Sequence, residues 1–252
     1  APQQGKNVAV KGDLGQSAAG KTDKNGELTV PEVEQTERHG VYIVGYTDGT
    51  FGPSRSMTRS EAAAIFARLL AEKNGDTIST AANTKFADIP AHAWYSGYVK
   101  YLSNNGITYG KSKTIFAPND AITRAEFTTM AVRFFDVYGD GDAEIMEQFS
   151  GFNDVSSGYW AAEYIKYAAL HGWINGYGDG SFHADREINR AEVVTIVNRL
   201  LGREADEDYI ADNLRKLNTF PDVTTRHWAF YAGLDAANAH TSVLGESESW
   251  SK

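Results

Sequence analysis

The sequence predicts one mainly helical domain in which three repeats close into a ring. Three blocks of residues recur along the 252-residue chain: a tetrapeptide that contains Arg, a block that runs from Phe through Asp to Trp, and a Gly-rich loop. Such self-similarity is sought before individual elements are assigned, because a missed repeat misassigns the whole fold.

The Arg-containing blocks occupy residues 57–61, 122–126 and 188–192, and their arginines lie 65 and 66 residues apart. In each block a capping residue is followed three positions later by Glu, which is the spacing of a helix-capping box. The caps and their glutamates are Thr58 and Glu61, Thr123 and Glu126, and Asn189 and Glu192. Apolar residues then recur at helical spacing, and Gly139 and Gly202 mark the expected ends of the second and third helices.

The Phe/Trp blocks predict a second helix in each repeat, because apolar residues follow them at helical spacing. The Trp residues that open these helices are Trp94, Trp160 and Trp228. A large aromatic at this spacing is typical of core packing, which we favour, and the alternative is a ring that faces a sugar. An extra helix is expected over residues 206–217, and a turn between short extended pieces over residues 21–28.

The Gly-rich loops begin 14 positions before each Arg and cover residues 45–51, 110–116 and 176–182. Asp48 and Asp179, each followed by Gly, are typical turn formers, and we favour this over a ligand contact. The middle loop keeps only the first Gly and the last Phe, and it has Lys111 and Lys113 where the other loops have Tyr and Asp.

The order of the blocks predicts ring closure. The first Arg block has no Phe/Trp block before it, and the last Phe/Trp block has no Arg block after it. The simplest closure lets the C-terminal block complete the first repeat, since a linear array would need capping repeats. The expected divisions are a linker-like extension (1–40), the loop and Arg helix of the first repeat (41–85), the second repeat (86–151), the third repeat with the extra helix (152–219) and the closing block (220–252).

Composition excludes several classes of protein. The net charge of −9 argues against nucleic-acid binding, which needs a dense basic stripe. Any anionic ligand must therefore be held by a few local cations. No apolar run approaches the roughly 18 residues of a membrane helix, so membrane insertion is not expected. The absence of Cys removes disulfides and thiolate sites, and the start at Ala1 without Met indicates a processed or truncated product.

Taken together, the Gly-Tyr-x-Asp-Gly-x-Phe, Ile-Thr-Arg-Ala-Glu and Phe-x-Asp-Val blocks resemble the S-layer homology repeat, over roughly residues 41–240. The resemblance implies a three-lobed, mainly helical prism with pseudo-threefold symmetry, found outside the cell at the Gram-positive cell wall or S-layer. It also implies a non-catalytic anchor that holds a secondary cell-wall polysaccharide, or a polymer linked to peptidoglycan, in grooves between lobes. In that family the polymer typically carries pyruvate ketals, so the ligand presents carboxylates.

Carried onto this sequence, the resemblance points to Arg59, Arg124 and Arg190 as the carboxylate-binding residues. The other candidate polysaccharide-binding residues are Gly45, Tyr46, Asp48, Trp94, Trp160, Gly176, Tyr177, Asp179 and Trp228. A cation at the first helical position faces the positive end of the helix dipole, so folding alone does not call for it. Free backbone N–H groups together with the guanidinium would bind an anion. The alternative is a structural Arg paired with an Asp of the Phe-x-Asp block or of the loop. The groove at the middle loop could be altered, non-functional or more attractive to an anion.

An enzyme is not expected, because no nucleophile elbow, P-loop, His-Glu-x-x-His or dinucleotide fingerprint occurs. No catalytic residue, cofactor or metal site is therefore expected. The loop at residues 139–144 resembles a calcium loop only loosely. The histidines, which show no metal-ligand spacing, are His39, His92, His171, His183, His227 and His240. The alternatives to an anchor are a self-assembling surface-layer component that acts through protein contacts, and a wall hydrolase whose catalytic domain, like any cargo, would lie upstream of Ala1.

Overall fold

A computed structural model of the chain describes residues 21–22, 28–29, 36–139, 149–243 and 249–251. The chain divides into two compact units, residues 1–35 and residues 36–252. In the first unit, strands β1 (Lys21–Thr22) and β2 (Leu28–Thr29) pair antiparallel, where the sequence predicts a turn between extended pieces. The calcium-like loop at 139–144 lies, after its first residue, outside the described residues.

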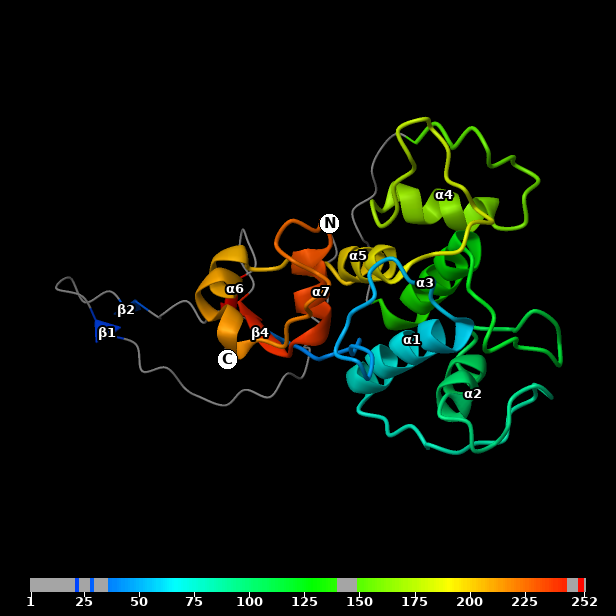
Figure 1. Cartoon of the computed structure of the whole chain (residues 1–252), viewed down its shortest axis with the longest axis horizontal. Coiled ribbons are helices and arrows are strands. Elements are labelled where there is room, and N and C mark those ends of the chain that lie inside the picture. The colour runs from blue at the N-terminus through cyan, green and yellow to red at the C-terminus, as the bar shows by residue number, and fades with distance from the viewer. Residues whose placement is uncertain (1–20, 23–27, 30–35, 140–148, 244–248, 252) are drawn as a thin grey trace, which may run out of the picture. The chain divides into compact units, whose positions relative to one another are not determined.

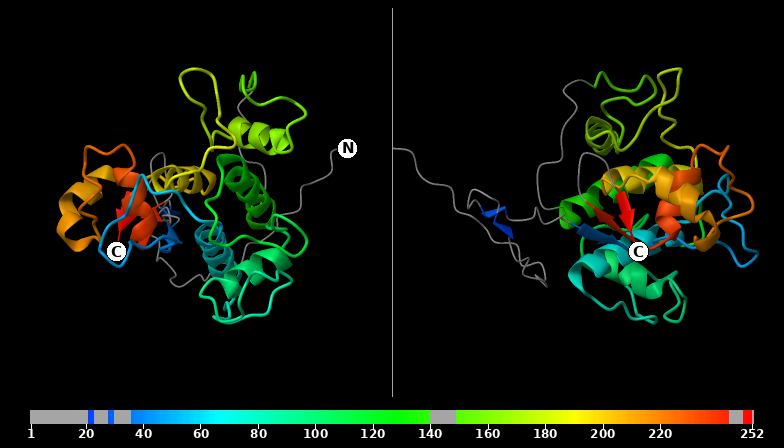
Figure 2. Two further views of the ribbon diagram at one scale, coloured as in Figure 1. Left: turned by 45° about the vertical axis from the view of Figure 1, so that its right-hand side comes forward. Right: turned by 90° about the vertical axis from the view of Figure 1, so that its left-hand side faces the viewer.

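The second unit is built from two kinds of helix (Figure 1). The Arg blocks begin α1 (Arg59–Asn74), α3 (Arg124–Tyr138) and α5 (Arg190–Leu200). Three outer helices pack in pairs with them: α2 (Ser96–Asn104) with α1, α4 (Ala162–Leu170) with α3, and α7 (Phe230–Ala237) with α5. Figure 2 shows α2 and α4 on opposite sides of α1 and α3. The mainly helical, three-lobed arrangement expected from the repeats is confirmed.

Two smaller features complete the unit. The predicted extra helix is α6 (Glu207–Asn213), which begins after the cap Asp206 and continues into the 3₁₀ turn η1 (Leu214–Lys216). Strands β3 (Thr36–His39), β4 (His240–Val243) and β5 (Ser249–Ser251) form an antiparallel sheet in that order. Within it His39 lies opposite His240, so the first strand of the unit pairs directly with a strand that follows the last helix.

The predicted capping boxes are present at all three Arg helices. The side chains of Thr58, Thr123 and Asn189 accept from the N–H three residues on. The carboxylate of the glutamate at that position accepts in turn from the backbone N–H of the cap. Gly139 ends α3 as predicted, while α5 ends two residues before Gly202. None of the described helices has the length and hydrophobicity needed to span a bilayer.

A ring of three backbone hydrogen bonds lies where the segments that precede the Arg helices meet. The N–H of Met57 donates to the carbonyl of Ile188 at 3.0 Å, Ile188 donates to Ile122 at 3.0 Å, and Ile122 donates to Met57 at 2.8 Å. Each of the three side chains is fully buried. The three lobes are therefore joined around one centre.

The first backbone amides of each Arg helix are also occupied by a neighbouring lobe. For α1, the N–H groups of Arg59 and Ser60 donate to the carbonyls of Asp120 and Pro118. The starts of α3 and α5 repeat this pattern with carbonyls at residues 184 and 186, and 53 and 55. The expectation that free N–H groups would help to bind an anion is wrong, because the helix-start donors already have partners within the fold.

The Asp of each Phe-x-Asp block holds a Gly-rich loop. Asp222 accepts from the N–H groups of Phe51 and Gly52 at 2.8 and 2.7 Å. Asp88 and Asp154 make the same pair of bonds to residues 116–117 and 182–183. Because Asp222 lies in the C-terminal block and Phe51 in the first loop, this contact completes the first repeat, and the predicted ring closure is confirmed.

The Phe of each block explains why every loop begins with Gly. A Cβ on Gly45 would lie 2.6 Å from the ring of Phe220. A Cβ on Gly110 would lie 2.5 Å from the ring of Phe86, and one on Gly176 would lie 2.4 Å from the ring of Phe152. Only a residue without a side chain allows this approach. The same rings contact the last Phe of each loop, at centroid distances of 5.1–5.5 Å. The middle loop therefore keeps the two residues that packing requires.

The tetrapeptide arginines join the lobes as well. The Nε of Arg59, Arg124 and Arg190 donates to the carbonyl of the last Phe of the adjacent loop at 2.7–2.9 Å. The Nη1 of Arg59 lies 3.3 Å from Glu126, and that of Arg124 lies 3.1 Å from Glu192. For Arg59 and Arg124, the predicted alternative of pairing with an Asp is thus replaced by pairing with a capping-box Glu of the next repeat.

Stability should depend on pH through the Asp-to-loop contacts. Burial raises the pKa of Asp154, but the N–H groups of Phe182 and His183 lower it more, so the net pKa is below the ordinary value. This contribution is present above the unfolded-state pKa of about 3.9 and is lost as pH falls through the lower folded pKa. We expect Asp154→Asn to cost about 1.5–3 kcal/mol near neutral pH and to flatten the acid limb of urea stability curves. The exposed Asp212→Asn should follow the wild type, and equal acid limbs in all three proteins would contradict the assignment.

Removing a tetrapeptide guanidinium should destabilise the fold. The side chain of Arg124 is 5% exposed, and its loss takes a donor from the carbonyls of Phe182 and Asn175 and removes the more buried of the two cations that contact Glu192. We expect Arg124→Ala to lower the unfolding free energy by about 3–5 kcal/mol, measured by urea denaturation. Arg186 contacts the same Glu192 but is 40% exposed, so Arg186→Ala should cost about 0–1 kcal/mol. Equal costs would show that Arg124 is not a structural link.

Candidate functional site

Three grooves of matching composition lie at the Gly-rich loops. Each is lined by the first Gly of a loop, the Arg that begins one Arg helix, the capping-box Glu of the next Arg helix, and the Trp of a Phe/Trp block. We number them by their loops. Groove 1 contains Arg190 and Trp94, groove 2 contains Arg59 and Trp160, and groove 3 contains Arg124 and Trp228.

Groove 1 is the largest, with a volume of about 460 Å³. The guanidinium of Arg190 donates from Nη2 to the carbonyl of Val44 at 2.8 Å and lies 4.6 Å from the ring centroid of Tyr46. Arg55 lies over the same ring at 3.9 Å. Two guanidinium groups thus contact the ring of Tyr46 at the wall of the groove.

Groove 3, of about 220 Å³, repeats this arrangement with more ionic contacts. The Nη2 of Arg124 donates to the carbonyl of Asn175 at 3.2 Å, and its guanidinium carbon lies 5.2 Å from the ring centroid of Tyr177. The hydroxyl of Tyr177 donates to Glu192 at 3.1 Å, and Arg186 contacts both of these residues.

Groove 2 is the smallest, at about 100 Å³, and carries the altered middle loop. Lys111 replaces the Tyr of the other loops, and Asp120 stands where they have Arg55 and Arg186. The ammonium of Lys111 lies 3.6 Å from carboxylate oxygens of both Asp120 and Glu126. The cation therefore stands at a different loop position in this repeat and still faces the capping-box Glu.

The tetrapeptide arginines are buried cations. Each is 4% exposed, and burial lowers the pKa of Arg124 and Arg190. A guanidinium has five N–H donors and stays charged in proteins, so bonds to Phe182, Glu192 and Asn175 leave Arg124 with further donor capacity. A desolvated cation of this kind binds an anion more strongly than a cation in water does.

The three tryptophans are exposed, which corrects the prediction that they pack in the core. Trp94, Trp160 and Trp228 are 55, 57 and 63% exposed. Each lies two residues before its helix, and the next residue in the chain takes the buried position. Those buried residues are Tyr95, Ala161 and Ala229. The Trp rings are therefore free to face the grooves that they line.

The remaining candidates divide into groove and turn residues. Tyr46 and Tyr177 line grooves 1 and 3, as do Gly45 and Gly176, whose recurrence is explained by the Phe contacts described above. Asp48 and Asp179 line none of the three grooves. Each carboxylate accepts from the N–H and hydroxyl two residues on, and these bonds lower the pKa of both groups. The preference for a turn-forming role is borne out by these bonds.

A second set of recurring cations was missed by the sequence reasoning. Arg68, Arg133 and Arg199 each lie nine residues after a tetrapeptide Arg, and each lines one of the grooves. Arg68 and Arg133 lie over the rings of Tyr98 and Tyr164 from the neighbouring outer helix. The spacing of nine residues between two arginines, which occurs in all three repeats, is the signal that could have revealed them. Two cations from neighbouring Arg helices thus line each groove of an acidic chain.

Comparison with known proteins agrees with the repeats. The S-layer homology domain matches residues 29–63, 85–128 and 151–194. Cell surface glycoprotein 1 of Acetivibrio thermocellus is 34% identical over 83% of this chain, which corresponds to 9% of that protein. The cellulosome-anchoring protein of the same organism is 30% identical over 92% of the chain and 49% of that protein. The surface-layer 125 kDa protein of Lysinibacillus sphaericus is 32% identical over 63% of the chain and 13% of that protein.

The chain thus spans about half or less of the length of these relatives. The three matched segments each end within an Arg helix, so the matches follow the repeats that the structure contains. The chain is a member of the S-layer homology domain family and carries three copies of its repeat.

Proposed function

We propose that the three grooves bind an anionic polysaccharide of the bacterial cell wall, and that the chain is a non-catalytic anchor at the cell surface. The observation that carries this proposal is the threefold recurrence of an exposed Trp beside a buried Arg. An indole face suits the apolar face of a sugar ring, and a guanidinium suits a carboxylate. Packing does not account for the exposed Trp, because the next residue in the chain takes the buried position.

The carboxylate that we expect is a pyruvate ketal on a secondary cell-wall polysaccharide. The acidic chain, with a net charge of −9, offers no long-range attraction to an anion. Recognition must come from the two cations of each groove. One is the tetrapeptide Arg of one Arg helix, and the other lies nine residues after the tetrapeptide Arg of the next Arg helix. Grooves at three loops would allow one polymer to make several contacts, which raises the overall affinity without any strong single site.

Groove 1 should contribute most to binding. It is the largest, and Arg190 and Arg68 line it together with Tyr46 and Trp94. In groove 2, by contrast, Lys111 is engaged with two carboxylates and the volume is less than a quarter of that in groove 1. We expect groove 2 to bind weakly.

The test uses the tryptophans, because substituting the arginines also destabilises the fold. Co-sedimentation with Gram-positive sacculi should show binding that mild acid extraction of the non-peptidoglycan polymer abolishes. We expect Trp94→Ala to weaken binding about five- to tenfold, which corresponds to about 1–1.4 kcal/mol, Trp160→Ala to have less effect, and the triple Trp variant to bind hardly at all. Added salt should weaken binding only moderately, because partly buried contacts are poorly screened.

The control is Val137→Ala, an exposed position on α3 outside the three grooves, which should bind as the wild type does. Thermal unfolding of each variant establishes that the fold is intact. Undiminished binding by the triple Trp variant would contradict the groove assignment. Binding that survives extraction would instead indicate peptidoglycan or protein contacts, and concentration-dependent light scattering without polysaccharide would favour a self-assembling surface-layer component.

A further inference from the structure

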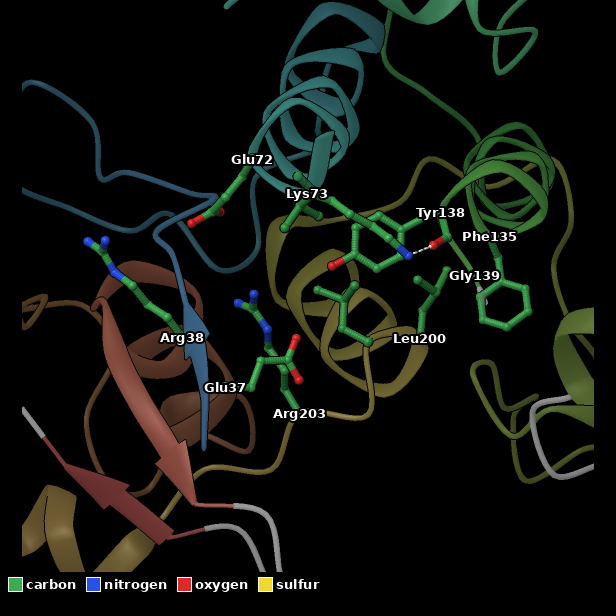
Figure 3. A pocket seen from close by; sticks show the side chains of 11 residues that line it. Glu37, Arg38, Glu72, Lys73, Phe135, Tyr138, Gly139, Leu200 and Arg203 are labelled. Atoms are coloured by element: carbon green, nitrogen blue, oxygen red, sulfur yellow. Dashed lines mark hydrogen bonds between the residues drawn. The ribbon is translucent and has the colours of Figure 1, made fainter. Parts of the chain in front are cut away.

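A wall residue of a cavity outside the three grooves, Arg203, also contacts a buried polar cluster. This cavity, of about 440 Å³, lies at the C-terminal ends of α1, α3 and α5 and is lined by Leu69, Phe135 and Leu200 (Figure 3). Arg203 forms part of its wall and is only 8% exposed. From there its Nη1 reaches the carbonyl of Gly40 at 3.3 Å and Oδ1 of Asp235 at 4.0 Å.

The cluster consists of His39, Asp235 and His240. His39 ends β3, Asp235 lies in α7, and His240 begins β4. Their exposed fractions are 4, 0 and 6%, so all three are removed from water. Burying a carboxylate is costly unless a cation or hydrogen bonds compensate, and the grooves make no use of these residues.

The donor atoms of the three side chains surround one point. Nδ1 of His39 lies 3.1 Å from Nε2 of His240, which lies 3.8 Å from Oδ2 of Asp235. One ligand atom from each residue lies within 4.8 Å of the other two. Bond lengths of about 2.0–2.2 Å around a zinc ion place its N and O ligands about 3.3–3.5 Å apart, which small movements would reach.

The surroundings orient two of the three donors, those of His240 and Asp235, toward that point. Nδ1 of His240 lies 3.0 Å from the carbonyl of Asn238, so the proton belongs on Nδ1 and the lone pair of Nε2 faces the cluster. The indole of Trp250 stacks on the His240 ring at a centroid distance of 3.6 Å. Oδ1 of Asp235 faces Arg203, while Oδ2 faces the histidine. Such outer contacts are typical of histidines and carboxylates that bind a metal.

We propose that His39, Asp235 and His240 form a binding site for a divalent transition-metal ion, with Zn²⁺ as the representative. Two imidazoles and a carboxylate suit Zn²⁺ better than Ca²⁺ or Mg²⁺, which take oxygen ligands. A water would complete the coordination. Because β3 is the first element of the second unit and β4 follows the last helix, the ion would link the segments that enter and leave the ring of helices. Binding to the folded state alone would stabilise it by mass action.

The test measures metal uptake directly on the untagged chain after removal of metals with a chelator. We expect calorimetric titration with Zn²⁺ to give one site per chain, and Co²⁺ to give visible absorption bands that Zn²⁺ abolishes. Asp235→Asn and His240→Asn should each weaken Zn²⁺ binding at least tenfold, while the exposed His92→Asn should bind as the wild type does. Zn²⁺ should raise the melting temperature of the wild type and of His92→Asn only.

A second measurement needs no variant and so remains informative if a cluster variant fails to fold. Ring-nitrogen NMR signals of the unmodified chain should show two histidines that shift together on addition of one equivalent of Zn²⁺, with a neutral Nδ1–H tautomer at one of them. Absence of saturable Zn²⁺ uptake by the folded chain would overturn the proposal, and so would uptake that His240→Asn leaves unchanged. Shifts confined to exposed histidines would also overturn it.

Discussion

The three lobes depend on an exchange of backbone hydrogen bonds at the point where the Arg helices begin. Met57, Ile122 and Ile188 bond to one another in a ring, and the next amides of each helix donate to loop carbonyls of a neighbouring lobe. Because the first two amides of each Arg helix find their acceptors in another lobe, each lobe needs its neighbours. This constraint also creates the grooves, since it brings the Arg of one lobe beside the Glu, loop and Trp of others.

The recurring residues serve two different requirements, and the middle repeat separates them. Its loop keeps Gly110 and Phe116, which pack against Phe86, and it changes the residues that line or flank the groove. Lys111 replaces the Tyr of the other repeats and Asp120 replaces their Arg, yet a cation still faces the capping-box Glu. Packing therefore fixes the scaffold at all three sites, whereas the chemistry of the groove varies. The tetrapeptide Arg belongs to both groups, because it links lobes and lines a groove.

The sequence signals predicted the fold well, since capping boxes and helical periodicity depend on neighbours in the chain, and block order can be read along the whole sequence. The three caps, the extra helix and the closure of the ring all followed from them. What the sequence did not reveal depends on tertiary packing. The tryptophans are exposed because the next residue takes the core position, and the helix-start amides are used by loops about 60 residues or more away in the chain. His39 and His240, 201 residues apart, had no spacing that could connect them.

The antiparallel pairing of β3 with β4 has a consequence for how the chain folds. The first Gly-rich loop is held by Asp222, which lies 171 residues after Phe51, and Thr36 pairs with Val243. Contacts of such long sequence separation carry a high loop-closure entropy and slow folding, so the first lobe stays incomplete until the last has been made. Adjacent ends also make the unit a natural candidate for circular permutation. A chain opened between two lobes and joined across β3 and β4 would keep every contact of the ring while changing which lobe must wait.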